Sequence, residues 1–338
     1  MTALIRLEAA CGQAPSMPYG GVQEPRTITL GEKGEPLRPG PLHISICIPT
    51  LEPGDEVSRF LANLRDEPLP NGVRLAEIIV VTPRRSAGRL AGQFGDGEAR
   101  VGVLLEPRPR GKAAALRAAA HLLTGEVVVV ANGDALPCAG AIGELLAPYA
   151  EGDHELVAFA RPFASARGFV GRLFALLWRI HDAYIMCRGA GRAHLPGELF
   201  AVPLFLLRSL RDDVVNDDSY LLRRAKALGL RVAYLRRALV RTKAPADIAA
   251  FFFQRLRINR GHLQELSATA RDPPGVLLGI LASPPSGLSF FACVVKSIRS
   301  AGEVPLLLAL AGVEAWALAL AVLAVALGLK QRLPWRRG

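Results

Sequence analysis

The 338-residue sequence lacks the features of a disulfide-rich or secreted protein. Its five cysteines are scattered at positions 11, 47, 138, 187 and 293, and no two have the C-x-x-C spacing. An odd, scattered set argues against a disulfide framework and a zinc site, and favours a reducing compartment. Residues 1–40, which are rich in Gly and Pro, contain no apolar stretch long enough for a signal peptide, and we expect a loosely ordered arm there.

Aromatic residues are also sparse, at 6%, and charged residues make up 21% of the chain. With 51% hydrophobic residues, the composition excludes a disordered chain and does not fit a polytopic carrier. Basic residues are in excess, and the formal charge is +11. This balance favours an anionic partner, such as nucleotide phosphates or an acidic membrane face. No nucleic-acid recognition motif is present, so we expect no nucleic acid as partner.

Continuous β-branched runs alternate with helical segments between residues 41 and 245. This pattern predicts an α/β domain with a mostly parallel central sheet covered on both faces. We expect strands at His43–Pro49, Leu75–Thr82, Val101–Glu106, Glu126–Ala131, Glu198–Pro203 and Arg231–Leu235. We expect helices over Gly54–Glu67, Lys112–Leu123 and Asp217–Leu228, the last ending at Gly229 as its C-cap. Ligands bind such sheets at the carboxyl ends of the strands.

The C-terminal region is apolar and predicts a membrane anchor. From Val304 to Leu329 only glycines and Glu314 interrupt the apolar run, which exceeds the ~20 residues of a spanning helix. A second run over 276–295 is broken by Ser283–Ser286, so it predicts a broken span, a re-entrant segment or an interfacial helix. Because both runs lie outside the α/β pattern, we expect a chain lacking residues 272–338 to bind nucleotide still.

The distribution of basic residues predicts how the chain is oriented in the membrane. The tail is basic, which marks it as cytoplasmic through Lys330, Arg332, Arg336 and Arg337. A catalytic domain on the cytoplasmic side of the cell membrane then requires an even number of crossings. Lys296 and Arg299, in the short loop, weaken the hairpin interpretation, so one span and two spans both remain open. The stretch Ala166–Arg188 is equally consistent with a membrane-interface helix and a core helix.

Two segments near strand ends carry candidate chemistry. Asn132-Gly133-Asp134 follows the strand Glu126–Ala131 directly, where a carboxylate is well placed to hold a divalent cation against a diphosphate. The alternative is a simple Asn-Gly-Asp turn. Arg108–Lys112 opens an Ala-rich helix, so its amides and lysine predict a phosphate-binding corner or, alternatively, a solvated basic loop.

Two further segments combine several charges. Asp212–Ser219 contains four carboxylates, for which we expect an N-cap at Asn216 or Asp217 and a general base in a cleft. The segment 246–275 holds Gln254–Arg260, a basic run expected to contact lipid headgroups or to clamp a diphosphate.

Taken in order over residues 43–260, these segments resemble the family 2 glycosyltransferases, which are inverting enzymes with a GT-A fold. Ile44–Thr50 is similar to the opening strand with its Pro-Thr, and Gly111–Leu116 to a G-K-x-x-A-L segment near the nucleotide. Asn132-Gly133-Asp134 resembles the metal-binding D-x-D, and Asn216-Asp217-Asp218 resembles the acidic pair whose second member is the catalytic base. Gln254–Ile258 is similar to the Q-x-x-R-W motif of membrane-associated members.

The resemblance implies roles for particular residues. Asp218 would be the catalytic base, with Asp217 beside it, and Asp134 would hold Mg²⁺ or Mn²⁺. The donor would be bound by Pro49, Thr50, Glu52, Lys112, Asn132, Asp134, Gln254, Arg255 and Arg257. The sequence departs from the family pattern at Thr82, where many relatives have an Asp that contacts the base, at Asn132, and at Ile258, which replaces the Trp of processive synthases.

The sequence therefore predicts a GT-A-like nucleotide-sugar-binding domain over 41–245, an interfacial segment over 246–275 and a membrane region over 276–338, with a possible span at 276–295 and an expected one at 304–329. The predicted activity is metal-dependent inverting transfer of a single sugar from a nucleotide-sugar donor to a lipid or lipid-linked acceptor. A processive polysaccharide synthase and a catalytically silent membrane scaffold are the alternatives. The sugar, the nucleotide and the acceptor are not specified by the sequence.

Overall fold

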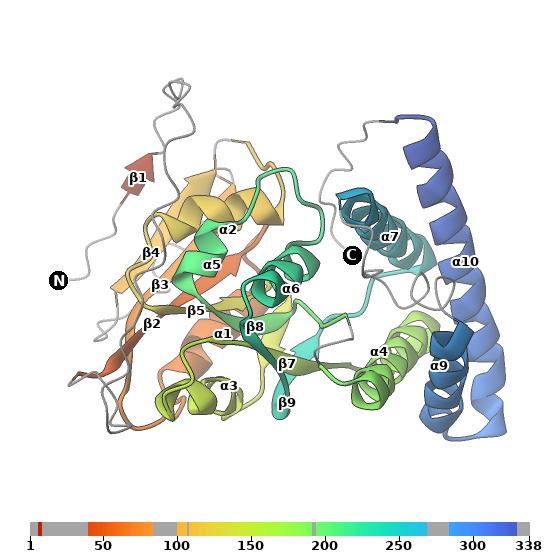
Figure 1. The fold of residues 1–338 in the computed structure, drawn as a ribbon, viewed down its shortest axis with the longest axis horizontal. Helices are drawn as coiled ribbons and strands as arrows, with labels where there is room; N and C mark the ends of the chain where they lie inside the picture. Colours follow the sequence, from red (N-terminus) through yellow and green to blue (C-terminus); the bar gives the residue numbers. More distant parts are fainter. Residues whose placement is uncertain are drawn as a thin grey trace.

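The computed structural model describes residues 6–8, 40–83, 100–106, 108–190, 194–268 and 284–329. The centre of this part of the chain is a nine-stranded sheet in the order β1-β4-β3-β2-β5-β8-β7-β9-β6 (Figure 1). The strands are β1 (Arg6–Glu8), β2 (Leu42–Pro49), β3 (Val73–Pro83), β4 (Arg100–Glu106), β5 (Val127–Ala131), β6 (Ala135–Pro137), β7 (Leu156–Ala164), β8 (Leu199–Pro203) and β9 (Arg231–Thr242).

Parallel pairing dominates the sheet, as predicted. β1, β4, β3, β2 and β5 pair in parallel, and so do β7 and β9. β8 runs antiparallel to β5 and β7, and β6 runs antiparallel to β9. The reversal at β8 brings its first residues beside the end of β5, where the Asn132 amide donates to the Glu198 carbonyl at 2.9 Å.

Helices cover both faces of the sheet. On one face lie α1 (Asp55–Leu64) and α3 (Ala141–Ala150), and on the other lie α2 (Lys112–Ala120), α5 (Leu204–Arg208) and α6 (Asp217–Ala227). Every residue of β5 is apolar because both faces of this strand are buried. Val127 and Val129 pack on the face that α1 and α3 cover, and Val128 and Val130 pack on the face that α2, α5 and α6 cover. Strands that are buried on both faces have this pattern.

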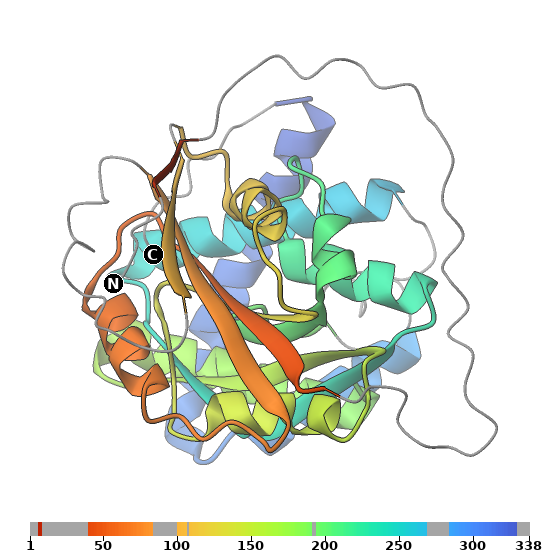
Figure 2. The same cartoon turned by 90° about the vertical axis from the view of Figure 1, so that its left-hand side faces the viewer.

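A second group of helices packs beside the sheet and forms its own core. It comprises α4 (Gly168–Arg188), α7 (Ile248–Ala268), α9 (Pro284–Ser297) and α10 (Val304–Ala326), with the short 3₁₀ turn η2 (Ala301–Glu303) before α10. Seen from the sheet side, α7 and α10 lie behind the strands (Figure 2). α4 buries Leu173 and Phe174 in this core, while Phe169 and Met186 are exposed, so α4 packs as a core helix that keeps an apolar outer surface.

One helix among the described residues, Ala301–Ala326, is long and apolar enough to cross a membrane. α9 has 14 residues, fewer than the ~20 that a spanning helix needs. The part of the predicted 276–295 run before residue 284 lies outside the described residues, as do residues 1–5 and 9–39 of the N-terminal arm.

Several elements differ from the prediction. α3 and β7 were not predicted, and β9 is longer than the expected Arg231–Leu235 because it continues to Thr242. The continuation is interrupted by a shift of register opposite Ala160 and Arg161, and the exposed Arg236 and Arg237 occupy this irregular stretch. Such a bulge breaks the two-residue alternation by which a strand is recognised.

Candidate functional site

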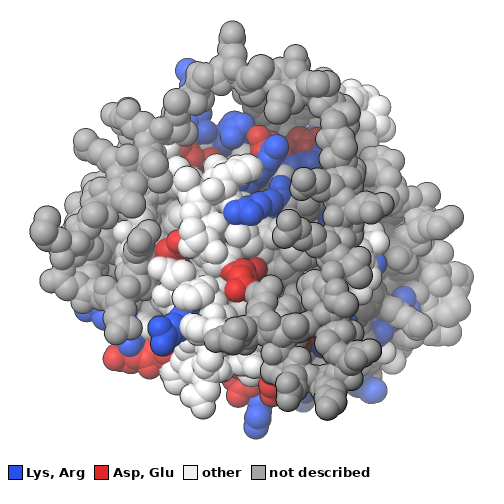
Figure 3. Space-filling model, turned by 60° about the vertical axis from the view of Figure 1, so that its left-hand side comes forward, with Lys and Arg blue, Asp and Glu red and all other residues white. Residues whose placement is uncertain are grey.

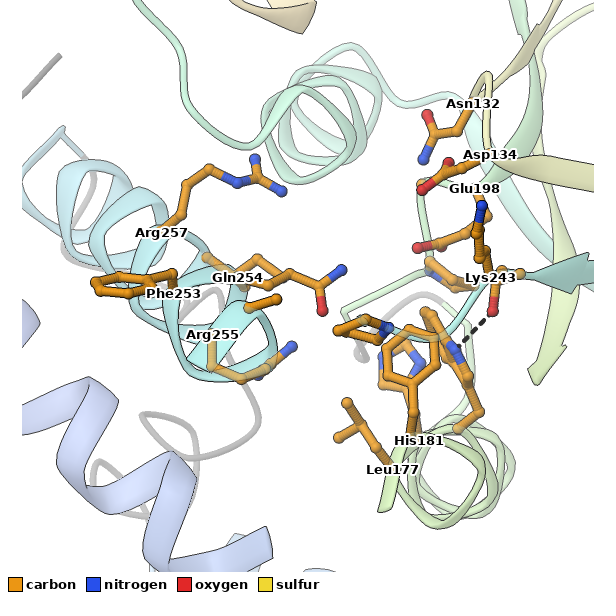
Figure 4. A pocket seen from close by; sticks show the side chains of 18 of the residues that line it. Asn132, Asp134, Leu177, His181, Glu198, Lys243, Phe253, Gln254, Arg255 and Arg257 are labelled. Carbon is orange, nitrogen blue, oxygen red and sulfur yellow. Dashed lines mark hydrogen bonds between the residues drawn. The ribbon is translucent and has the colours of Figure 1, made fainter. Parts of the chain in front are cut away.

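A cavity of about 1250 Å³ opens at the carboxyl ends of β2 and β5 and continues between the helices of the second group. The predicted donor-binding and catalytic residues lie on its wall: Pro49, Thr50, Glu52, Lys112, Asn132, Asp134, Asp217, Asp218, Gln254, Arg255 and Arg257. Figure 4 shows Asn132, Asp134 and Glu198 on one side and Gln254 and Arg257 of α7 on the other. Segments separated by more than a hundred residues thus meet at one place.

The Asn132–Asp134 turn is held tightly against the end of β2. The Gly133 amide donates to the Pro49 carbonyl at 3.2 Å, and a Cβ at Gly133 would lie only 2.4 Å from the Cβ of Thr50. Only glycine permits this approach. The turn projects the exposed Asp134 side chain into the cavity (Figure 4). The sequence left open whether this segment is a simple turn or a place for a cation. The structure shows a turn, and this turn also positions the Asp134 carboxylate in the cavity.

The oxygens at this turn suit a hard divalent cation. Partial desolvation raises the pKa of Asp134, while Lys112 and Arg257 act in the opposite direction. The buried Asn132 Oδ1 has no hydrogen-bond partner among the described residues. The same residues contain no group of three His, Cys, Asp or Glu side chains that could hold a metal. A cation here would rest on Asp134 together with water and phosphate oxygens, as Mg²⁺ commonly does.

Lys112 begins α2 immediately after Gly111, which has a φ of +114°. Its ammonium lies 2.8 Å from Asp217 Oδ2 and donates to the Gly197 carbonyl at 3.1 Å. The ion pair is buried, with Asp217 only 5% exposed. Lys112 thus joins α2 to α6 across the floor of the cavity.

The second acid of the pair, Asp218, also lines the cavity. Among the described residues, the only basic side chain within ion-pair distance of it is His194, which is neutral at pH 7. Its Oδ1 accepts the Ser219 amide at 2.7 Å, and its Oδ2 lies 3.9 Å from His194 Nε2. Burial is the main cause that raises the pKa of Asp218, and Lys112 opposes it. A carboxylate with a raised pKa is a stronger proton acceptor, which is what a general base requires.

The predicted N-cap position of α6 is confirmed at Asn216, but the side chain does not cap the helix. Asn216 Nδ2 instead donates to the Ile258 carbonyl of α7 at 2.9 Å, and Asp217 is paired with Lys112. These two side chains tie α6 to its neighbours because the interior offers each a partner that the helix end does not.

On α7, Arg257 and Arg255 differ in what they face. The half-buried Arg257 forms no ion pair with any described residue and experiences the charges of Asp217, Asp218 and Asp134. Arg255 is paired through Nε with Glu314 of α10. The Arg255 guanidinium is therefore held by an acid from the apolar C-terminal run, and its role in donor binding stays a prediction. Arg257 is the cation directed at the strand ends.

The sequence did not single out Glu198 as a site residue. It lies in the cavity wall at the start of β8, and its Oε2 has no hydrogen-bond partner among the described residues. Burial and the charge of Asp218 raise the pKa of Glu198 to about 8. Glu198 is thus protonated at neutral pH and can donate a hydrogen bond. The signal that could have identified Glu198 is its position, because it directly precedes β8 at the edge of the sheet where β5 ends.

Three histidines from separate elements also meet beside Asp218. The rings of His181 and His194 have centroids 5.7 Å apart, and those of His194 and His262 lie 4.9 Å apart. Burial lowers the pKa of His181 to about 3 and that of His194 to about 4. All three are neutral at pH 7, since burial also holds the pKa of His262 well below its usual value.

The remaining acids of the predicted cluster lie on the surface. Asp212 pairs with Arg110 at 3.0 Å and with Arg117 at 3.2 Å, and Asp213 pairs with Arg211 at 2.6 Å. On the face shown in Figure 3, basic and acidic side chains lie next to one another at the upper and lower margins. Asp212 and Asp213 therefore have no part in the cavity.

The comparisons with known proteins identify this class of site. The family model described as "Glycosyltransferase like family 2" matches residues 39–261. A search of the curated proteins found no significant match. A mannosyltransferase from Pyrobaculum calidifontis, solved with GDP-mannose and Mn²⁺, is 21% identical, with 87% of this chain and 88% of that chain covered and a TM-score of 0.56. Glucosyl-3-phosphoglycerate synthase from Mycobacterium tuberculosis, solved with Mn²⁺, UDP and phosphoglyceric acid, is 20% identical, with 67% and 78% covered and a TM-score of 0.46.

The fold and the site thus define a GT-A glycosyltransferase. The chain belongs to the family described as "Glycosyltransferase like family 2". The predicted family and fold class are confirmed. The expectation of Mg²⁺ or Mn²⁺ agrees with the Mn²⁺ in the Pyrobaculum calidifontis structure.

Proposed function

We propose that this chain is a membrane-bound inverting glycosyltransferase that moves a single sugar from a nucleotide-sugar donor to a lipid or lipid-linked acceptor. One observation carries the proposal: the cavity that contains Asp134 and Asp218 continues between α4, α9 and α10. A water-soluble acceptor has no need of such a passage. The exposed apolar side chains Phe291, Val295, Leu308 and Trp316 on α9 and α10 support contact with a bilayer.

The donor would lie at the strand ends. A divalent cation at Asp134 would neutralise the donor diphosphate and stabilise it as a leaving group. Arg257 faces the same region and would bind the phosphate oxygens, because a guanidinium matches their geometry. The neutral Glu198 lies in the wall between the two acids, where it would donate a hydrogen bond to the donor sugar.

The acceptor would be activated by Asp218. This carboxylate would remove the proton of the acceptor hydroxyl as its oxygen bonds to the anomeric carbon. The bond from that carbon to the diphosphate oxygen breaks at the same time, and the electron pair leaves with the nucleoside diphosphate. Attack opposite to the leaving group inverts the anomeric configuration.

The buried Asp217–Lys112 pair would hold α6 in place. Lys112 at 2.8 Å fixes the neighbour of the base, so that Asp218 is presented to the cavity. Ile258, in the position of the Trp of processive synthases, supports transfer of one sugar over polymerisation.

The test is transfer by the purified full chain in detergent. Labelled GDP-mannose, UDP-glucose and other nucleotide sugars are incubated with Mn²⁺ and a total lipid extract from the source cells. We expect one donor to give a labelled lipid that carries one added sugar. A ladder of products would support a processive synthase instead. The absence of any labelled product, with donors bound or not, would favour the scaffold alternative.

A further inference from the structure

The cavity has two chemically distinct ends. Asp134 and Asp218 lie at the polar end. The apolar arm is the part lined by Leu177 of α4, Phe290 and Val294 of α9, and Leu307 and Leu310 of α10. Figure 4 shows Leu177 below the polar side chains, on the side where α4 faces the cavity. A substrate that fills both ends has a polar reacting group and an apolar body.

The charge on the cavity wall is strongly negative. Nine carboxyl groups and four cationic groups of the described residues line it. Three of the cations are already paired: Lys112 with Asp217, Arg255 with Glu314, and Lys243 with Glu56. Arg257 is the remaining cation on the described wall, and the charges of three carboxylates, Asp217, Asp218 and Asp134, act on it. The three histidines are neutral at pH 7, so they add no cation.

The excess of negative charge on the cavity wall disfavours an anionic acceptor. A phosphate monoester carries about −1.5 to −2 charges at pH 7. It would have to enter beside Asp217 and Asp218, where Arg257 is the one unpaired cation of the described wall and three carboxylates already share its charge. Its oxygen is also already deprotonated and gains nothing from a general base. An alcohol brings no charge, and its proton has to be removed. Asp218, with its Oδ2 near His194 and without a cationic partner, suits an alcohol.

We infer that the acceptor is a neutral, hydroxyl-bearing lipid, with its hydroxyl at Asp218 and its hydrocarbon chain in the apolar arm. This inference rests on the proposed function, transfer of a sugar to a lipid, and names the class of lipid. A lipid phosphate, such as a polyprenyl phosphate, is the acceptor that it excludes.

The experiment uses the linkage of the product. Labelled lipid from the total extract is treated with mild acid, which cleaves a sugar attached to phosphate and leaves an O-glycoside intact. Matched pairs of acceptors, polyprenol with polyprenyl phosphate and diacylglycerol with phosphatidic acid, are tested alongside. We expect acid-stable product and at least tenfold preference for the hydroxyl member of a pair. Acid-labile product, or preference for the phosphate member, overturns this inference and leaves the proposed function intact. Absence of labelled lipid refutes the proposed function itself.

A substitution tests the apolar arm separately. Leu177→Trp should fill the arm and raise the KM for the long-chain acceptor at least tenfold, with the donor KM unchanged. Leu323→Trp, on the exposed side of α10, is the matched control and should leave both KM values unchanged. Equal acceptor KM values in wild type and Leu177→Trp would show that the chain does not occupy the arm. Measuring a short-chain alcohol in parallel shows whether Leu177→Trp retains a folded site.

A second inference concerns α10 and comes from different contacts. α10 touches the catalytic domain along its whole length: Leu306 and Leu310 pack against α4, α7 and α9, and Ala317 and Ala321 pack against Leu256 of α7. At its end, Arg260 donates to the Leu329 carbonyl at 2.8 Å. If α10 crossed a bilayer with these contacts intact, α7 and its arginines would be drawn into the hydrocarbon, which is costly.

We propose that α10 lies in the plane of the membrane and does not cross it. Its outer face is apolar, with Leu308 and Trp316 each 68% exposed and Leu323 51% exposed. A helix buried by one apolar face in the membrane interface has this character. The proposal also needs no second span, because a helix that lies in the membrane plane makes no crossing.

Spin labels at single cysteines test this geometry. Leu308→Cys, Trp316→Cys and Leu323→Cys are made in a cysteine-free chain that retains transfer activity, and their depths in vesicles are compared. We expect three similar depths, with tags at the two chain ends on the same side of sealed vesicles. A crossing helix would place position 316 about 12 Å deeper than 308, from 1.5 Å per residue. That depth difference, or tags on opposite sides, would overturn the proposal.

Discussion

Exchanging the two adjacent acids for asparagine should produce two different kinds of damage. Asp218→Asn removes the proton acceptor but retains the shape of the side chain and its hydrogen bond from the Ser219 amide, which is 2.7 Å long. General-base assistance contributes about 10²–10⁴-fold, or about 3–5 kcal/mol of barrier at 1.36 kcal/mol per tenfold. We expect turnover at saturating donor and acceptor to fall by that factor, with donor affinity and thermal stability close to wild type.

Asp217→Asn instead breaks a buried ion pair. Its partner Lys112 lies 2.8 Å away, with side chains only 12% and 7% exposed for Lys112 and Asp217. Removing one member of such a pair costs about 3–5 kcal/mol of folding free energy, because the other charge stays buried and unpaired. At about 2–4 °C per kcal/mol, the Tm should fall by at least about 6 °C.

The two variants are assayed side by side by turnover and by thermal unfolding in the same detergent. The double variant Lys112→Met with Asp217→Leu is the control, since removing both charges should recover much of the lost stability. If Asp217→Asn loses turnover but no stability, while Asp218→Asn turns over normally, the assignment of the base is wrong. If neither loses more than a few-fold in turnover, the base is not in this pair.

Three further predictions concern the rest of the cavity. Asp134→Ala should abolish Mn²⁺-dependent donor binding in calorimetry while the Tm changes little; unchanged affinity would remove Asp134 from the cation site. Glu198 has a pKa raised from 4.5 to about 8, so its own contribution to folding stability is most favourable below pH 4.5 and is lost as the pH rises towards 8. Glu198→Gln should therefore gain Tm relative to wild type between pH 5 and 8, and a constant difference would contradict the raised pKa. Glu314→Gln should destabilise the fold by about 3–5 kcal/mol by leaving Arg255 buried without a counter-charge, and Glu314→Leu with Arg255→Met should restore it; equal stability of all three would show that the pair is not buried.

The elements of the domain core could be predicted because each is determined by a pattern within its own stretch of sequence. β5 and its flanking turn follow from five apolar residues that end at Asn132, and all five are buried. The same holds for α6, whose end at Gly229 requires the positive φ of 74° that glycine adopts easily. Parallel strands also bring their ends to one edge, so the close approach of Thr50 and Gly133 could be expected from the order of the strands alone.

Contacts between distant segments could not be predicted in this way. The partner of Arg255 is Glu314, 59 positions later, where it is the one charged residue in the apolar run Val304–Leu329, and no local pattern connects the two. Likewise, the three histidines come from α4, the loop before β8 and α7. The C-terminal region is consequently a wall of the cavity, and a chain lacking residues 272–338 would expose the apolar faces of α4 and α7 that α9 and α10 cover.

The burial of polar groups explains the remaining differences. Asn216 or Asp217 was expected to cap α6 because such residues favour that position. In the folded chain a lysine and a carbonyl from other elements satisfy them better, and their own helix end is left uncapped by side chains. Partners of this kind depend on the packing of α2 and α7, which the segment itself does not encode.

The anomeric configuration of the product tests the account most directly. The purified full chain is given an α-linked nucleotide sugar, Mn²⁺ and the lipid acceptor, and the product is examined by proton NMR of its anomeric signal. The account predicts one β-linked sugar per acceptor in the wild type and a 10²–10⁴-fold slower formation of the same product with Asp218→Asn. An α-linked product, or formation at an equal rate in the Asp218→Asn variant, would contradict direct displacement assisted by Asp218.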